Sequence, residues 1–364
     1  MLVPAEKMQI FDPIYDEVIM SSKSAESVIC TRHFQRLASL SQLCGLSKIH
    51  PSAHHCRYTH SIGVSHLAKR FVIHLLEDCK QMQHLDVRKY STIAEIAGLC
   101  HDIGHGPFSH LFESVMREIS PERPFHHESC SIVLIDHMIQ ENRLEDVFNA
   151  DCGINRRDID LIKSMILGEK EEYFQKYPEA SRRDEAFLFD IIANNRNGID
   201  VDRVDYLHRD SFFLKAPHRI DYRWLMQSSK LVIASNDSHI AFDIRNIDEI
   251  VNFYTLREFM YMNYYKSARC ELMSKIIIKI ITLGNAEPYI FHPNIKDLRD
   301  ICDDPLLIIH LTDDRLLQAI EDSKSNRDEI VEAKSELERL TKKDFGKIVA
   351  EISVDREFKI IISV

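Results

Sequence analysis

The chain has 364 residues, of which 45% are hydrophobic, and its formal net charge is −11 at pH 7. This length and apolar content exclude a disordered chain and allow one large domain or two smaller ones. The acidic balance argues against a general nucleic-acid or anionic-membrane surface, because both concentrate Lys and Arg, although it still allows a local basic pocket.

The cysteines and the apolar runs bear on the compartment. Nine cysteines, an odd number with no C-x-x-C pair, favour a reducing compartment over a disulfide framework. The start of the chain has no signal-peptide pattern, and the most apolar run, SKIIIKIITL, is short and carries lysines. We therefore expect an intracellular protein that is not in the membrane, without distinguishing cytoplasm from nucleus.

The first hundred residues predict a hairpin followed by helices. Residues 10–21 predict a short edge hairpin, and residues 30–46 predict an amphipathic helix that ends at a glycine. A second helix follows, in which His60 shares a three- and four-residue spacing with apolar residues. Because a buried histidine is unfavourable unless its nitrogens are bound, His60 is either hydrogen-bonded or a metal ligand.

The central stretch, residues 96–110, reads IAGLCHDIGHGPFSH. An apolar helix over residues 92–103 should end at the glycines and the proline that follow, with His101 and Asp102 in its last turn. An imidazole beside a carboxylate suits a divalent first-row metal ion. The structural alternative is a satisfied core histidine beside a solvated aspartate, and two ligands are too few to hold an ion.

The second half is also mainly helical. Helices are expected over residues 126–142 and 156–168, and residues 168–186, dense in charge, predict an exposed loop. A helix beginning near residue 199 places Asp202, Tyr206 and Asp210 on one face, while Asp200 and Asp205 point elsewhere. An exposed acidic helix would show a similar pattern.

Towards the C-terminus, residues 230–244 predict a hairpin and residues 248–283 a long helix or helix pair whose aromatic residues belong to the core. A charged, exposed helix over residues 323–343 and a terminal hairpin over residues 347–364 complete the expectation. The predicted fold class is mainly α with small β-hairpins.

Together, His60, His101, Asp102 and Asp202 offer two nitrogens and two oxygens from three helices. Such a set leaves positions on a six-coordinate ion for water and a phosphate oxygen. In this order the residues resemble the H…HD…D signature of the HD-domain phosphohydrolases. Longer blocks, RYTHSIGVSHLA, IAGLCHDIGHGPFSH and NGIDVDRVDYLHRD, resemble the catalytic core of the SAM and HD domain-containing deoxynucleoside triphosphate triphosphohydrolases.

The resemblance covers about residues 8–270, and we expect no SAM domain in this sequence. It implies an HD-domain helical core over residues 1–285, with a mixed α/β lobe over residues 286–364 packed on that core. It also implies hydrolysis of dNTPs at the α-phosphorus to deoxynucleoside and inorganic triphosphate. The alternatives are an HD-fold phosphohydrolase acting on another nucleotide, and a non-catalytic scaffold that binds nucleotides or single-stranded nucleic acid.

Carried over by position, the resemblance assigns the metal ligands to His60, His101, Asp102 and Asp202. Nitrogen and oxygen ligands suit Fe, Mn or Zn, and Mg²⁺ would accompany the substrate phosphates. His105, His110 and His127 would line the phosphate path. Either His110 or His127 would protonate the leaving 5′-oxygen, because histidine donates protons readily near neutral pH. Glu113 stands where the family has an aspartate that orients the second of these histidines.

The remaining implied contacts are with the substrate. Arg57, Arg203 and Arg257 match positions that hold the triphosphate, which carries roughly four negative charges; the structural alternative for each is a weak surface ion pair. Position 203 is a lysine in the family, so the geometry there can differ. The other substrate positions are Gln42 and Asp210 at the 3′-hydroxyl, Tyr206 at the sugar, Tyr265 near the base, and Leu43.

The sequence departs from the family where a guanine nucleotide drives tetramer assembly of the animal enzymes. Cys30 and Ala38 replace the aspartate and arginine that read the guanine, and Phe11, Ile49 and His50 also differ. We therefore expect guanine-nucleotide activation of that kind to be absent or altered. A homodimer is the expected assembly, with a higher homo-oligomer as the alternative.

Overall fold

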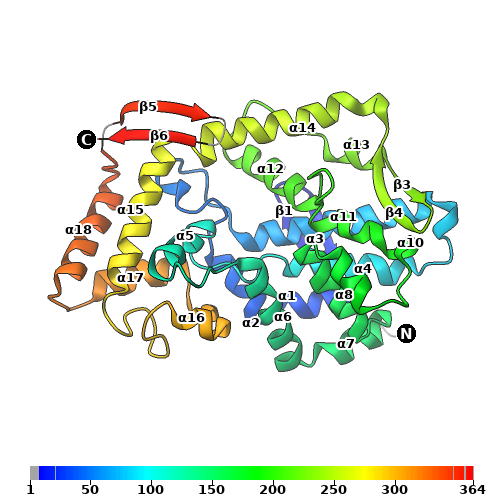
Figure 1. Ribbon diagram of the computed structural model, residues 1–364, viewed down its shortest axis with the longest axis horizontal. Coiled ribbons are helices and arrows are strands. Elements are labelled where there is room, and N and C mark those ends of the chain that lie inside the picture. The colour runs from blue at the N-terminus through cyan, green and yellow to red at the C-terminus, as the bar shows by residue number, and fades with distance from the viewer. Residues whose placement is uncertain (1–7, 21, 347, 356–357, 364) are drawn as a thin grey trace. The chain divides into compact units, whose positions relative to one another are not determined.

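In this computed structural model, the described residues are 8–20, 22–346, 348–355 and 358–363. Within them the fold is mainly helical, with three two-stranded antiparallel sheets, as predicted (Figure 1). The chain forms two compact units. Unit 1 comprises Met1–Leu37, Tyr58–Gly104 and Glu128–Leu256, and unit 2 comprises Ala38–Arg57, His105–His127 and Arg257–Val364. The predicted boundary at residue 285 stays a prediction. None of the helices in the described part of the chain is long and apolar enough to cross a bilayer.

Unit 1 holds most of the helices and two of the hairpins. The α-helices are α1 (Lys23–Ile29), α2 (Arg32–Gln35), α3 (Arg57–Asp78), α4 (Val87–Cys100), α6 (His127–Asn142), α7 (Leu144–Cys152), α8 (Arg156–Leu167), α9 (Lys170–Lys176), α10 (Arg182–Glu185), α11 (Phe189–Ile192), α12 (Val201–Phe213), α13 (Tyr222–Gln227) and α14 (Ile247–Met260), the last continuing into unit 2. The 3₁₀ helices are η1 (Arg36–Ser39), η3 (Lys80–Met82), η4 (Ala186–Leu188) and η5 (Ile244–Asn246). The hairpins pair β1 (Met8–Asp12) with β2 (Asp16–Met20), and β3 (Ser229–Ala234) with β4 (Asp237–Phe242).

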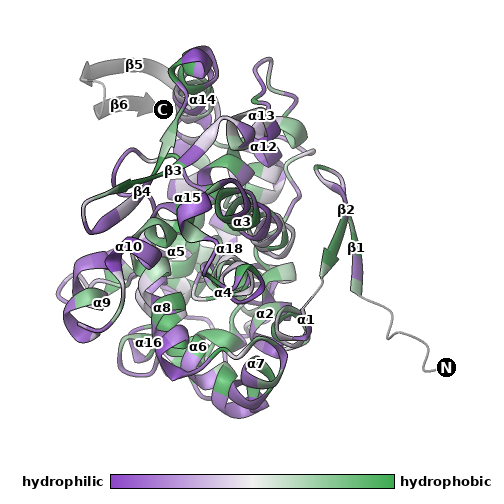
Figure 2. Ribbon diagram, turned by 90° about the vertical axis from the view of Figure 1, so that its right-hand side faces the viewer, coloured by the Kyte–Doolittle hydropathy of each residue, from purple (hydrophilic) through white to green (hydrophobic). Residues whose placement is uncertain are grey.

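Helix α4 is central to unit 1. It begins at the side chain of Asp86, which accepts a hydrogen bond from the backbone N–H of Lys89 at 3.1 Å, and every residue from Ser91 to Cys100 is buried. It packs against α1, α7, α8 and α11. Figure 2 shows α3 and α4 nearly end-on, with hydrophobic residues in both. The helix ends at Cys100, three residues before the predicted end at residue 103, so that His101 is its C-cap and Asp102 lies in the turn that follows.

The helix predicted over residues 30–46 is wrong. Helix α2 ends at Gln35, η1 follows, and the next residues pair with the segment before α3. The backbone N–H of Gln42 donates to His55 O at 3.1 Å, and that of Arg57 donates to Leu40 O at 3.0 Å. Phe34, Leu37 and Leu40 are nevertheless fully buried, so the apolar spacing identified the core residues but not the backbone.

The exposed loop predicted over residues 168–186 is also wrong, because α9 and α10 lie there. Tyr173 and Phe174 are buried at 2% and 7% exposure, and the Arg182 guanidinium lies 4.7 Å from the Phe174 ring centre. The charges pair nearby, with Arg157 on the buried Glu185. Two adjacent aromatic residues anchor this segment, which is why it lacks an apolar stripe in the sequence.

Unit 2 is organised around α15 (Ala268–Gly284), which packs against α5, α17, α18 and β5. Its other elements are η2 (Leu46–Lys48), α5 (His110–Ile119), the π-helical turn η6 (Tyr261–Tyr265), α16 (Asp300–Asp303), η7 (Pro305–His310), α17 (Asp313–Asp322), α18 (Asp328–Lys342) and the hairpin of β5 (Ile348–Asp355) with β6 (Phe358–Ser363). The predicted helix pair is confirmed as α14 and α15. Its aromatic residues are not all core, since Tyr254 and Tyr261 are 39% and 44% exposed.

Candidate metal centre and histidine cluster

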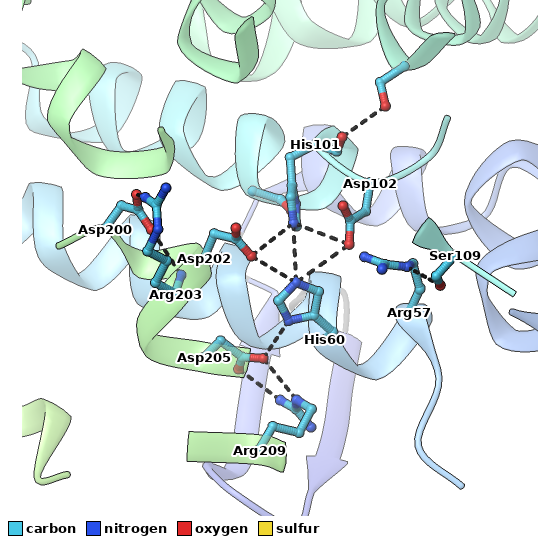
Figure 3. Close-up of polar contacts among 12 residues, drawn as sticks. Arg57, His60, His101, Asp102, Ser109, Asp200, Asp202, Arg203, Asp205 and Arg209 are labelled. Atoms are coloured by element: carbon cyan, nitrogen blue, oxygen red, sulfur yellow. Dashed lines mark hydrogen bonds and ion pairs between the residues drawn. The ribbon is translucent and has the colours of Figure 1, made fainter. Parts of the chain in front are cut away.

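Four predicted ligands converge in unit 1 on a single point between their side chains (Figure 3). His60 Nε2 lies 3.0 Å from Asp202 Oδ1 and 3.5 Å from Asp102 Oδ2, and His101 Nε2 lies 3.5 Å and 3.4 Å from the same two oxygens. The two Nε2 atoms are 3.2 Å apart. His60, His101 and Asp102 are buried, and Asp202 is half-buried.

Two glycines let the three helices that carry these residues approach closely. A Cβ atom on Gly98 of α4 would lie 2.8 Å from the backbone N and Cα of Ser65 in α3. A Cβ atom on Gly63 of α3 would lie only 1.9 Å from Asp205 Oδ1 in α12. A side chain at Gly98 would therefore push α4 away from α3, whereas one at Gly63 would displace the Asp205 carboxylate and the Arg209 guanidinium.

The orientation of His60 is fixed by a contact at its other ring nitrogen, Nδ1. Its Nδ1 bonds Asp205 Oδ2 at 2.7 Å, and Asp205 in turn accepts from Arg209 Nε at 2.9 Å and Nη2 at 3.0 Å. Arg209, fully buried, also donates to Asp12 Oδ2 at 2.8 Å. With its Nδ1–H donated to a carboxylate, the ring presents the Nε2 lone pair to the other ligands, which is the arrangement that metal-binding histidines commonly show.

His101 is oriented by backbone groups. Its Nδ1 lies 2.8 Å from Gly98 O, so Nε2 again faces the cluster. Ser131 of α6 donates its hydroxyl to His101 O at 2.8 Å and accepts the N–H of Gly104 at 2.9 Å. This hydroxyl ties the turn after α4 to α6.

The electrostatics of the cluster favour a cation. Burial alone would lower the pKa of His60, but its hydrogen bonds to Asp202 and Asp205 raise the pKa to about 10. Burial likewise opposes the shift at His101, where Asp102 and Asp202 raise the pKa. Against burial, the two imidazoles lower the pKa of Asp202. Two carboxylates and two imidazoles in contact, each imidazole held by a partner on Nδ1, fit a divalent first-row ion.

The geometry also separates Asp202 from Asp200. Asp200 is the N-cap of α12: its Oδ1 accepts the backbone N–H of Arg203 at 2.9 Å and its Oδ2 that of Asn194 at 3.0 Å. The Arg203 guanidinium contacts the same carboxylate. Asp200 is thus occupied in starting the helix, whereas Asp202, two residues on, reaches the two histidines.

A second group of predicted residues lies together in unit 2. The rings of His105 and His127 stack with centroids 3.7 Å apart, and the His110 ring lies 4.9 Å from His105 and 5.3 Å from His127. Glu113 Oε1 is 2.6 Å from His127 Nδ1, and Glu113 Oε2 is 4.0 Å from His110 Nδ1. Against the effect of burial, the two histidines hold the pKa of Glu113 well below its usual value.

The predicted substrate residues divide between the units. Tyr206 and Asp210 lie on α12 with Arg203, and Asp210 is buried while Tyr206 is half-buried. In unit 2, Arg57 is buried and donates from Nε to Ser109 Oγ at 2.7 Å. The other unit 2 positions are the buried Gln42, the half-buried Leu43 and Tyr265, and the exposed Arg257.

Sequence reasoning missed the role of three residues behind His60. Asp205 was placed off the ligand face, which is correct, yet its carboxylate is what holds the imidazole. The sequence signal that could have revealed this role was Arg209. It follows Asp205 by four residues, so the two side chains share one face of the helix, and both are buried there. Asp12 comes from the distant β1–β2 hairpin, and nothing in its local sequence connects it with α12.

Residues 57–210 match the HD domain family, and this span contains all four converging residues. This segment of the chain is similar to the HD domain. Over 90% of its length it is 33% identical to the deoxynucleoside triphosphate triphosphohydrolase SAMHD1 homolog of Dictyostelium discoideum, of which it covers 57%. It is 30% identical to SAMHD1 of Xenopus laevis over 94% of its length, and 31% identical to the human protein over 71%, covering 56% and 41% of those proteins.

The chain thus spans about half the length of the relatives it matches. The resemblance inferred from the sequence motifs is confirmed: the chain is similar to the HD domain family and to deoxynucleoside triphosphate triphosphohydrolases.

Proposed function

We propose that this protein is a metal-dependent dNTP triphosphohydrolase that releases deoxynucleoside and inorganic triphosphate. The observation that carries the proposal is the convergence of His60, His101, Asp102 and Asp202 inside an HD domain, where each histidine Nε2 lies 3.0–3.5 Å from a carboxylate oxygen of both aspartates. The printed names of the relatives, deoxynucleoside triphosphate triphosphohydrolases, supply the substrate class.

In this proposal the four residues hold one divalent ion, with Fe, Mn or Zn suited to the donors and Mg²⁺ to the substrate phosphates. The bound ion supplies Lewis-acid polarisation of the phosphoryl group and activation of the attacking water. Asp205 holds the His60 ring in place at 2.7 Å, and the Gly98 carbonyl does the same for His101 at 2.8 Å. The ligands are therefore preorganised before any ion binds.

The leaving 5′-oxygen needs a proton, and the histidine cluster of unit 2 is the proposed source. His127 is the better-held donor, because Glu113 contacts its Nδ1 at 2.6 Å and stands 4.0 Å from that of His110. A carboxylate on Nδ1 fixes the orientation of the ring. His110, whose side chain is 64% exposed, and the buried His105 are assigned to the phosphates.

Arginines and polar side chains would bind the rest of the nucleotide. Arg57, Arg203 and Arg257 are proposed to hold the triphosphate, which an acidic chain can attract only through local cations. Tyr206, Gln42, Leu43, Asp210 and Tyr265 keep the sugar and base roles that the resemblance gives them. The side-chain oxygen of Gln42 is buried and has no hydrogen-bond partner among the described residues, as expected of a group that meets a ligand.

The test is to incubate the protein with each dNTP and NTP plus Mn²⁺ or Mg²⁺ and to separate the products by chromatography. Deoxynucleoside with intact triphosphate supports the proposal. Release of monophosphate and pyrophosphate, or turnover of another nucleotide only, would reassign the reaction within the HD fold. No turnover combined with tight oligonucleotide binding would favour the scaffold.

Site variants connect that reaction to the cluster. His101→Ala and Asp102→Ala should each abolish turnover and reduce bound metal, whereas Asn195→Ala, on an exposed side chain of the turn before α12, should leave both unchanged. Turnover that survives both ligand substitutions would exclude this cluster as the active site.

A further inference from the structure

Another group of potential metal ligands lies in unit 1. It is separate from the HD cluster, by which we mean His60, His101, Asp102 and Asp202, and the proposed reaction does not use it. His33 comes from α2, and His137 and Glu141 come from α6. Each residue offers one donor atom, and the three atoms lie within 4.8 Å of one another. His137 and Glu141 are four residues apart and therefore share one face of α6.

The contacts within this group leave a buried nitrogen unsatisfied. His33 is 1% exposed, and its Nε2 lies 2.9 Å from His137 Nδ1. Its other nitrogen, Nδ1, is 3.9 Å from Glu141 Oε2 and has no hydrogen-bond partner among the described residues. Because a neutral imidazole has one donor and one acceptor, this nitrogen is unsatisfied in either tautomer, and a buried polar group without a partner destabilises the fold.

We propose that His33, His137 and Glu141 form a second metal site, for a divalent first-row ion such as Zn²⁺. Two imidazoles and one carboxylate are a donor set that zinc accepts, with the fourth tetrahedral position left to water. The helical spacing of His137 and Glu141 presents two ligands from one rigid element, and α2 contributes the third from the side.

The position of His33 suits this role. Its Nε2 lies 2.9 Å from His137 Nδ1, and its buried Nδ1 lies 3.9 Å from Glu141 Oε2. The His33–His137 hydrogen bond satisfies one nitrogen of His33, whereas an ion shared with Glu141 gives the pair of rings a common partner.

Arg32 is the competing partner of Glu141. Its Nε donates to Glu141 Oε2 at 3.0 Å and its Nη2 to Oε1 at 2.7 Å. The Arg32 side chain is 54% exposed and that of Glu141 37%, and ion pairs as exposed as this contribute little to stability. The guanidinium can also remain on one carboxylate oxygen while the other binds the ion, and it then orients the ligand.

The test is the metal content of the full chain after dialysis against buffered free Zn²⁺, with Co²⁺ substitution to report ligand geometry by its visible absorption. Wild type should bind one ion at the HD cluster and one at the second site. His137→Ala and Glu141→Gln should each weaken the second site at least about tenfold and leave dNTP turnover unchanged. Gln140→Ala, on the exposed neighbouring position of α6, is the matched control and should retain both ions.

The two metal proposals fail separately. In a chain carrying His101→Ala and Asp102→Ala, the second-site ion should persist even though turnover is lost. The second site is overturned if His137→Ala and Glu141→Gln bind as much Zn²⁺ as wild type, or if wild type binds no ion beyond the one that His101→Ala removes. His33→Gln is not the primary variant, because a change at a fully buried position can unfold the chain.

Discussion

Replacing Asp205 by Asn should weaken metal binding at the HD cluster although Asp205 is not a ligand. The substitution keeps the size of the side chain but removes the charge that accepts from His60 Nδ1 at 2.7 Å and from two Arg209 nitrogens at 2.9 and 3.0 Å. An amide can present only one oxygen, so an N–H group must face either the imidazole or the guanidinium.

Two magnitudes follow. Loss of a partner behind a metal-binding histidine typically weakens metal affinity about 10–100-fold, or about 1.4–2.7 kcal/mol. Removing one side of a fully buried ion pair also destabilises the fold by about 3–5 kcal/mol, since Arg209 and Asp205 are both 0% exposed at their side chains. We expect the loss of fold stability to lie at the lower end of its range, because Asp12 still binds Arg209 at 2.8 Å.

The control is Asp12→Asn, which perturbs the same guanidinium without touching His60. Its Oδ1 accepts the backbone N–H groups of Ile14 and Tyr15, and the Asn oxygen can retain those bonds. Metal affinity is measured by competition with a chromophoric chelator, and stability by urea unfolding. Asp12→Asn should lose stability but keep its metal affinity within about twofold. Equal metal loss in both variants, or none in Asp205→Asn, would refute the proposed support of His60.

Four further outcomes are expected. Gly98→Ala should lower the unfolding free energy by about 1–3 kcal/mol and weaken metal binding, because the new methyl group would lie 2.8 Å from the α3 backbone; urea unfolding and chelator competition measure both. Burial, with Arg70 adding to it, lowers the pKa of His66 to about 4, so the neutral ring stabilises the fold above pH 6.5 and this stability is lost as the pH falls from 6.5 towards 4. Between pH 7 and pH 5, the free energy of unfolding of His66→Gln should therefore fall by about 1–2 kcal/mol less than that of wild type, as measured by urea unfolding at the two pH values. Asp313→Ala should lower both stability, by about 2 kcal/mol, and turnover, because the buried Asp313 carboxylate accepts two backbone N–H groups, one of them in the loop before α5. Added dGTP or GTP should change neither the sedimentation profile nor the turnover of a second dNTP, because Cys30 and Ala38 lack the groups that would read guanine.

The sequence predicted the convergence of the metal cluster because its members obey local rules. His60 recurs with apolar residues at helical spacing, and it is 1% exposed. The family resemblance assigned Asp202 rather than Asp200, helical phase agreed with that choice, and the structure places Asp200 in the N-cap of α12. Helix periodicity alone left structural alternatives open, and the order of the motifs, through the resemblance, selected the four residues.

Other features depend on contacts that no local pattern encodes. Residues 30–46 have the apolar spacing of a helix, but backbone pairing between residues 40–42 and 55–57 breaks it. Residues 168–186 look exposed to solvent because many of them are charged. Tyr173 and Phe174 are nevertheless buried, and short helices form in this segment. Asp12 and Arg209 are 197 positions apart, so their pairing needs the tertiary fold.

One glycine in α3 and one in α4 are needed for the close packing around the metal cluster. Gly63 and Gly98 lie inside helices, where glycine destabilises by about 1 kcal/mol relative to alanine, and by propensity alone they are weak points. In the structure each marks a place where neighbouring atoms come closer than a Cβ atom allows: the α3 backbone at Gly98, and the side chains of Asp205 and Arg209 at Gly63. A side chain at Gly63 would displace the Asp205 carboxylate, which holds His60 Nδ1 at 2.7 Å. The geometry of the metal centre therefore requires that Gly63 and Gly98 have no side chain. Substitution at either glycine should reduce metal affinity even where the fold survives.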